Sequence, residues 1–104
     1  MEKIVLCAAS FYEKKCFFNN KIGNLPKAVE DEIKAVSSVA AEKIRGIVII
    51  GFYEDFSVFI ETSKMENDFD YDEIGARLVV ESLKREKEEL LNSLSLWFRL
   101  IRKV

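Results

Sequence analysis

Two stretches of the chain have short apolar runs broken by turns, and two longer stretches have apolar residues at helical spacing. The segment 46–62, GIVIIGFYEDFSVFIET, holds two apolar runs separated by a short acidic turn. Successive side chains of a strand point to opposite faces, and both faces of the first run are apolar. Such a run is typical of a central strand that is covered on both sides. The segment therefore predicts a β-hairpin with strands over 46–53 and 56–62.

A weaker hairpin is predicted near the amino end, with strands over 4–11 and 15–19. Shifting the chain by 41 residues aligns 10–43 with 51–84 and gives 10 identities in 34 gapless positions. Average residue usage gives about two or three by chance. The chain holds either an internal repeat or two similar hairpin–helix units without common origin. The repeated residues, in the first copy, are Phe11, Tyr12, Glu13, Phe18, Asp31, Glu32, Ile33, Ala35, Val39 and Lys43.

The segment after the first hairpin predicts an amphipathic helix. Asn24 is the expected cap, and Pro26 suits the first turn because no intrahelical partner exists there for the missing amide. Gly46 is the expected stop. The apolar positions that recur every three or four residues are Val29, Ile33, Val36, Ala40 and Ile44.

The last third of the chain predicts a long helix that begins near Tyr71, where Asp70 and Glu73 fit a capping box. We expect either one helix or two with a kink near Asn92-Ser93. The alternation over 94–100 would also suit a strand, but the richness in Leu, Lys and Glu upstream favours a helix.

These elements predict an α+β fold in the order ββαββα. It has a four-stranded, mainly antiparallel sheet from two hairpins, helices on one face, and a long C-terminal helix. At 104 residues the chain is expected to form one domain. Its parts are a first ββα unit over 4–43, a second over 46–84, and a C-terminal helical extension over 85–104.

Composition limits the classes of partner and the compartment that we expect. Apolar residues make up 49% and charged residues 33%, with a net charge of −2. No basic field attracts duplex nucleic acid. Cys7 and Cys16 are out of register for a cross-strand disulfide, so we expect two thiols in a reducing compartment. No secretory signal and no run near the roughly 20 apolar residues of a membrane span are present. These features predict a cytoplasmic protein.

The hairpins carry aromatic residues on both faces of the predicted sheet, and two helices cover only one face. An uncovered aromatic side chain forgoes roughly 1.5–3 kcal/mol. We therefore expect either the C-terminal segment or a second subunit on the other face, and favour a homodimer that acts as a protein-interaction or regulatory module. The candidate interface residues are Phe11, Tyr12, Phe52, Tyr53, Trp97, Phe98 and Ile101.

The sequence gives little support for a catalytic function. The chain has no histidine, which removes the commonest general base. The acids over 68–72 lack the Gly and the final Glu of a calcium loop. We predict no catalytic, cofactor-binding or metal-binding residues and lean against an enzyme. Two alternatives stay open: a small-molecule pocket between sheet and helices, lined by Tyr12, Tyr53 and either Glu13 or Glu54, and a single-stranded RNA platform at Phe11-Tyr12 and Phe52-Tyr53.

Many short segments together resemble a family of small Firmicute, largely clostridial, proteins that is a domain of unknown function. The resemblance covers nearly the whole chain and implies a bacterial cytoplasmic protein with no assigned activity. It transfers no functional residues. The chain departs from the family at Glu54-Asp55, where an Asp-Gly-like turn is more usual. The segments are Val5-Leu6-Cys7, Tyr12-Glu13-Lys14-Lys15, Phe18-Asn19, Leu25-Pro26, Tyr71-Asp72-Glu73-Ile74, Arg85-Glu86-Lys87 and Leu94-x-Leu96.

Overall fold

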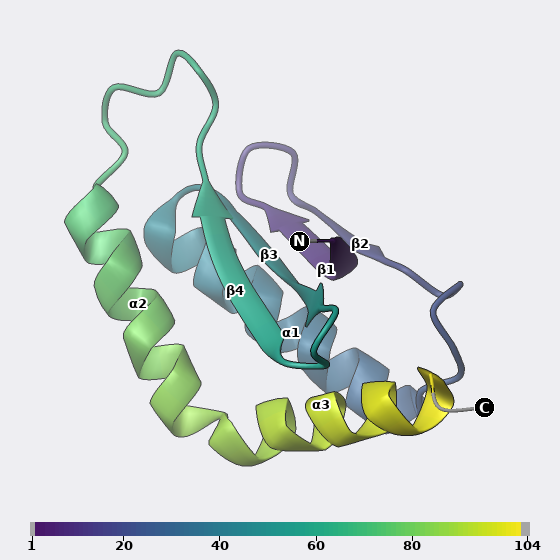
Figure 1. The fold of residues 1–104 in the computed structure, drawn as a ribbon. Helices are drawn as coiled ribbons and strands as arrows, with labels where there is room; N and C mark the ends of the chain where they lie inside the picture. Colours follow the sequence, from purple (N-terminus) through teal and green to yellow (C-terminus); the bar gives the residue numbers. More distant parts are fainter. Residues whose placement is uncertain (1, 103–104) are drawn as a thin grey trace.

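The computed structural model describes residues 2–102 as one four-stranded antiparallel sheet with three helices on one of its faces (Figure 1). The strand order is β2-β1-β3-β4, so each hairpin supplies one central and one edge strand. This arrangement confirms the predicted α+β class. The elements are β1 (Lys3–Ser10), β2 (Lys15–Phe18), α1 (Lys27–Ile44), β3 (Ile47–Tyr53), β4 (Val58–Ser63), α2 (Glu73–Glu86) and α3 (Glu88–Arg102).

The core lies between the sheet and the helices and has two parts. Near the α2 end, small side chains of α1 and α2 such as Ala40 and Ala76 let both helices approach Val48, Ile50 and Ile60 of the sheet. At the opposite end, α3 replaces α2, and larger side chains fill the space: Leu6, Ile33, Phe52, Leu94 and Phe98. Helix α1 contributes to both parts.

Helix α3 crosses the end of the sheet because two aromatic rings stack there. The rings of Phe52 in β3 and Phe98 in α3 lie 4.2 Å apart between centroids, with an angle of 8° between their planes. Both side chains are at most 1% exposed. Two hydrogen bonds fix the helix further: Ser95 Oγ donates to the Phe56 carbonyl at 2.6 Å, and Trp97 Nε1 donates to the Asn24 carbonyl at 3.2 Å.

A β-bulge in β1 breaks the strand's alternation. Val5 pairs with Gly51 of β3 and Cys7 with Ile50, so Leu6 is the extra residue. Leu6 and Cys7 are both fully buried, although neighbours in a regular strand face opposite ways. The bulge thus turns two consecutive side chains toward the helices.

The expected helix ends need correction. Helix α1 begins after Pro26, which makes no side-chain capping bond, so Asn24 is not the cap. Its stop is Arg45, which adopts the left-handed conformation at φ 54°, rather than Gly46. The N-cap of α2 is Asp72, whose carboxylate accepts from the Gly75 amide at 2.9 Å, and not Asp70.

The C-terminal segment is helical, as favoured over the strand alternative, but the break lies at Lys87 and not at Asn92-Ser93. The two hairpin–helix units are both present. Their correspondence is not the gapless one, because Phe11 and Tyr12 lie in the β1–β2 turn whereas Phe52 and Tyr53 lie within β3.

We predict that Phe98→Ala lowers the free energy of unfolding by about 3–5 kcal/mol, because it removes a fully buried ring and leaves a cavity against Phe52. The matched control on the same helix is Leu100→Ala, where the side chain is exposed. It should change stability by about 0.5 kcal/mol or less. Urea denaturation followed by circular dichroism measures both, and equal losses would contradict the stacking as the anchor of α3.

Candidate functional site

The face of the sheet opposite the helices has no element of residues 2–102 packed over it, and we call it the open face (Figure 1). The strand register identifies its members: Ala8 pairs with both Phe17 and Ile49, and Gly51 pairs with Phe59. Seven apolar side chains lie on this face, with Ser10, Lys15, Glu61 and Ser63 around them. The seven are Val5, Ala8, Phe17, Ile47, Ile49, Tyr53 and Phe59.

One part of the open face is already covered from within the chain. The Phe59 ring lies across Gly51, where a Cβ atom would come within 2.7 Å of it, so glycine is required at this position. Tyr53 packs beside Phe59, with ring centroids 5.1 Å apart. The Lys3 amino group lies over both rings and forms an ion pair with Glu61. Phe59 is consequently only 5% exposed.

The other part of the open face is hollow. A cavity of about 510 Å³ lies over Ala8 and Ile47, with Tyr12, Phe17 and Met65 among its lining residues. Phe17 is 59% exposed and Met65 is 55% exposed. Small side chains on the floor and two exposed apolar side chains beside it form a site that accepts an apolar group.

Hydrogen bonds fix one wall of this hollow. The hydroxyl of Tyr12, in the β1–β2 turn, donates to the Asp68 carboxylate and accepts from the Met65 amide at 3.3 Å. These bonds join the first hairpin to the projecting loop 64–72 across 53 or more residues of sequence. Burial and the Asp68 carboxylate both raise the pKa of the Tyr12 phenol. Tyr12 therefore holds the loop, and its hydroxyl is already engaged.

The sequence-predicted interface residues do not form one patch. Phe52 and Phe98 lie in the core, at 0% and 1% exposure, and present no surface to a partner. Trp97 and Ile101 contact the loop near Gly23, where both side chains lie under 3.5 Å from the position of an added Cβ atom. Tyr53 lies on the open face.

Phe11 and Tyr12 lie together in the β1–β2 turn, with ring centroids 5.8 Å apart, and the Lys14 amino group lies 3.8 Å from the Phe11 centroid. Tyr12 follows the end of β1, whereas Tyr53 pairs with Lys3 at its start, so the two tyrosines do not share a pocket. The hollow contains Tyr12 and Glu13 but lies on the open face, not between sheet and helices. Sequence reasoning missed Ala8 and Met65, because neither a small residue nor an isolated apolar one is a signal by itself. Phe17 is one of the hairpin aromatics that alternation distributes over both faces of the sheet, although it is not among the candidate interface residues.

The two cysteines meet at the helix-facing side of the sheet. Cys16 pairs with Ala9 and not with Cys7, so the two cysteines are out of register, as expected. The thiols nevertheless touch diagonally, with sulfurs 3.3 Å apart, and both are free. Ser37 Oγ lies 3.2 Å from Cys7 Sγ. Burial raises the pKa of the Cys7 thiol to about 12, and the Ser37 hydroxyl offsets only part of this. Cys7 is therefore protonated and unreactive at neutral pH.

Two further findings concern the described residues 2–102. They contain no cluster of three or more Cys, Asp or Glu side chains arranged to hold a metal ion. None of the three helices is both long and apolar enough to cross a membrane.

Comparison with known proteins places the chain in a family. Residues 3–103 match the sequence profile of a family of unknown function, DUF6145, and the chain belongs to that family. No curated protein and no solved structure shows significant similarity to the chain. The match extends over the sheet and all three helices.

We predict that Tyr12→Phe loosens loop 64–72 while leaving the sheet intact, because it removes only the hydroxyl that bonds Asp68 and the Met65 amide. Amide hydrogen exchange should become faster at Met65. Tyr53→Phe is the matched control, since no hydrogen bond of the Tyr53 hydroxyl occurs within residues 2–102. Unchanged exchange in Tyr12→Phe would contradict the role of this residue.

We predict that iodoacetamide labels Cys16 in the native protein and labels Cys7 only when the chain unfolds. Cys7 is fully buried and its pKa lies near 12, whereas Cys16 is half-buried. Because the folded pKa lies above the unfolded value of about 8.5, stability should also fall as pH rises through this window. Mass spectrometry of labelled peptides measures the order, with denatured protein as the control in which both react.

Proposed function

We propose that the chain is a non-enzymatic protein-interaction module that associates as a homodimer through the open face of its sheet. The observation that carries this proposal is the chemistry of that face on the central strand. In β3, the positions that point away from the helices are Ile47, Ile49, Gly51 and Tyr53. An antiparallel sheet that faces water carries polar residues at such positions.

The C-terminal segment does not cover this face, because α3 packs on the helix side with Phe52 and Leu6. Within residues 2–102, Phe52 and Phe59 are buried, and the exposed Phe17 is the part of the open face that we propose a second copy covers. A second copy remains the simplest cover, since it needs no other gene product and is always present at the same concentration.

The open face is also self-complementary. A two-fold axis places the same patch of both copies against each other. The exposed Phe17 ring stands beside a hollow with Ala8 at its floor. A two-fold axis that passes between the ring and the hollow would set each ring over the hollow of the other copy. Cations and an anion, Lys15 and Glu61 among them, surround the apolar centre, and the net charge of −2 gives little repulsion between copies.

The size of the face sets the expected interface area. Four strands about 4.8 Å apart, with a rise of about 3.3 Å per residue, give a footprint of roughly 400 Å². A standard interface buries about 800 Å² per partner. The exposed Met65 of loop 64–72, which lines the hollow, supplies additional contact area beside the sheet. A dimer of this size suits a regulated association better than an obligate one.

The expected setting is the bacterial cytoplasm, where the module serves as an adaptor or regulatory subunit. The two free thiols support a reducing compartment. The resemblance to Firmicute proteins supports the bacterial source.

The test is the molar mass at micromolar concentration, measured by light scattering after gel filtration. We expect the wild-type chain to be dimeric and Ile49→Lys to be monomeric, because the lysine enters the centre of the apolar contact. The fold of the variant should persist, since Ile49 points away from the helices.

The matched control is Val39→Lys, which places the same charge on an exposed apolar position of α1. It should leave the dimer intact. A monomeric wild type would refute the proposal, and a dimer that Val39→Lys dissociates but Ile49→Lys does not would move the interface to the helix layer.

A further inference from the structure

The outer edge of β4 carries a row of unused backbone hydrogen-bonding groups. Tyr53 donates its amide to the Ser57 carbonyl at 2.9 Å, which makes this a hydrogen-bonded pair. Bonded and non-bonded pairs alternate along an antiparallel ladder. The register therefore directs the N–H and C=O groups of Val58, Ile60 and Thr62 away from β3. Among residues 2–102, nothing bonds these six groups.

This edge lacks the protections that the strand itself can supply. Exposed edges are generally shortened, bulged or interrupted by proline or an inward-pointing charge. The opposite edge, β2, is only four residues long. In contrast, β4 has six residues, no proline and no bulge, and its side chains at the three outward-bonding positions are apolar or threonine. The β4 edge is thus a regular template for another strand.

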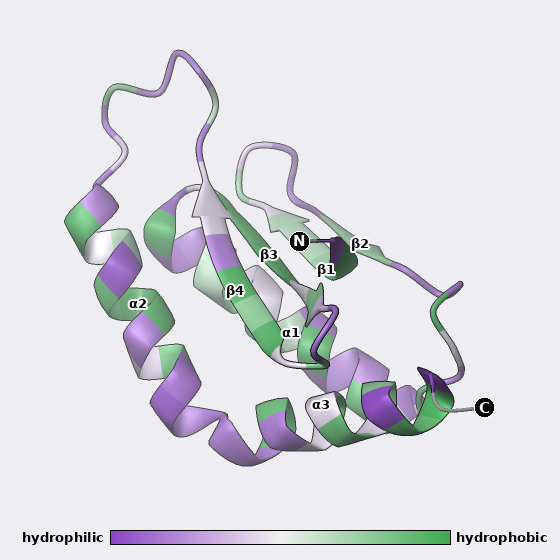
Figure 2. Ribbon diagram, viewed as in Figure 1, coloured by the Kyte–Doolittle hydropathy of each residue, from purple (hydrophilic) through white to green (hydrophobic). Residues whose placement is uncertain are grey.

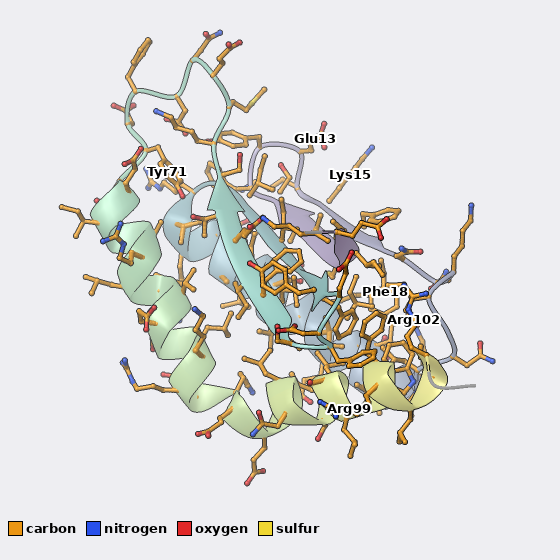
Figure 3. The ribbon with its side chains drawn as sticks, in the orientation of Figure 1. Glu13, Lys15, Phe18, Tyr71, Arg99 and Arg102 are labelled. Carbon is orange, nitrogen blue, oxygen red and sulfur yellow. The ribbon has the colours of Figure 1, made fainter. Side chains whose placement is uncertain are left out.

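A groove accompanies the edge. Two hollows, of about 440 and 420 Å³, lie between β4 and the helices, and both include Ile60. Tyr71 and Arg77 line the first, near the end of β4, and Figure 3 shows Tyr71 where the loop enters α2. Lys84 and Leu91 line the second, near the start of β4. The two hollows therefore follow the strand from one end to the other.

We propose that this edge and groove bind an extended peptide segment of a partner protein, which adds to the sheet as a fifth strand. Backbone bonds to Val58, Ile60 and Thr62 hold the segment. Its helix-facing side chains enter the two hollows. This site lies on a different surface from the open face and does not depend on dimerisation.

The position of α2 favours an isolated segment over the β4 strand of a second copy. In Figure 1, α2 runs beside the free edge of β4, and the first hollow lies between these two elements. The second hollow lies between β4 and the start of α3, with Lys84 at the end of α2 also lining it. A strand added at about 4.8 Å from β4 would lie over α2. A second copy would bring its own α2 into the same space, and two helices cannot pack closer than about 8 Å. An extended peptide segment with no attached helix avoids this clash and fits beside β4.

The groove also defines the chemistry of the segment. In the bound segment, the residues opposite Val58 and Thr62 face the hollows, so we expect them to carry large apolar side chains. The residue opposite Ile60 lies between the hollows, so we expect it to be small. The charged residues around the hollows are three cations and two anions, which gives no strong preference for a charged segment. These are Lys64, Glu73, Arg77, Lys84 and Glu88. The expected pattern is large apolar, any, small, any, large apolar.

The test uses a random peptide library displayed on phage, selected against the full chain. Enriched sequences should show this alternation. Synthetic peptides of the enriched sequences, labelled with fluorescein, are then titrated by fluorescence anisotropy against wild type, Thr62→Pro and Thr62→Val. Proline removes one outward N–H without touching the bonds to β3, whereas valine keeps it. We expect binding at least about tenfold weaker for Thr62→Pro and within about twofold of wild type for Thr62→Val.

Amide exchange of the wild-type chain gives a readout that does not depend on how well a variant folds. Bound peptide should slow exchange at Val58, Ile60 and Thr62. No enriched sequence, equal binding to Thr62→Pro and Thr62→Val, or unchanged exchange at these three amides would overturn the proposal. Loss of peptide binding in Ile49→Lys with no loss in Thr62→Pro would assign the peptides to the open face and would overturn it as well.

Discussion

The stacking of Phe52 against Phe98 determines which surfaces of this protein are open. It holds α3 on the face of the sheet that α1 and α2 already occupy. All three amphipathic helices therefore bury their apolar sides in one layer, and the opposite face of the sheet receives none of them. Charged side chains of α3 reinforce this anchor, since Arg99 lies over the Phe56 ring and Arg102 over the Phe98 ring. Figure 3 shows both arginines on α3.

The same layer explains the free edge. Helix α1 contributes side chains to both parts of the core, and α2 joins only the part next to β4. Figure 2 shows that β3 and the first half of β4 are hydrophobic, whereas the junction between α2 and α3 is hydrophilic. The helices consequently cover the centre of the sheet but leave the outer backbone groups of β4 without hydrogen bonds. The open face and the free edge of β4 thus both result from the placement of all three helices on one side of the sheet.

The sequence was sufficient for the fold class, because the two periodicities of strand and helix are strong over 46–62 and 27–44. It also predicted the helical C-terminal segment. The break at Lys87 was not predictable, since the charged run over 84–89 has good helix formers throughout and its end is set by packing of α3 on Phe52. For the candidate site, Tyr53 was found, but Phe52 was misplaced because alternation alone does not say which face the helices cover.

The bulge at Leu6 has a consequence for how the chain tolerates changes of length. It lets two parts of β1 with opposite alternation share one strand: Lys3 and Val5 face the open side before it, and Ala8 and Ser10 after it. Removal of one residue here would leave a strand with a perfectly ordinary composition. It would also leave a regular alternation in which Lys3 and Val5 still face the open side and Ile4 still faces the helices. A single-codon deletion at this point therefore removes the bulge without reversing the amino-terminal half of the strand.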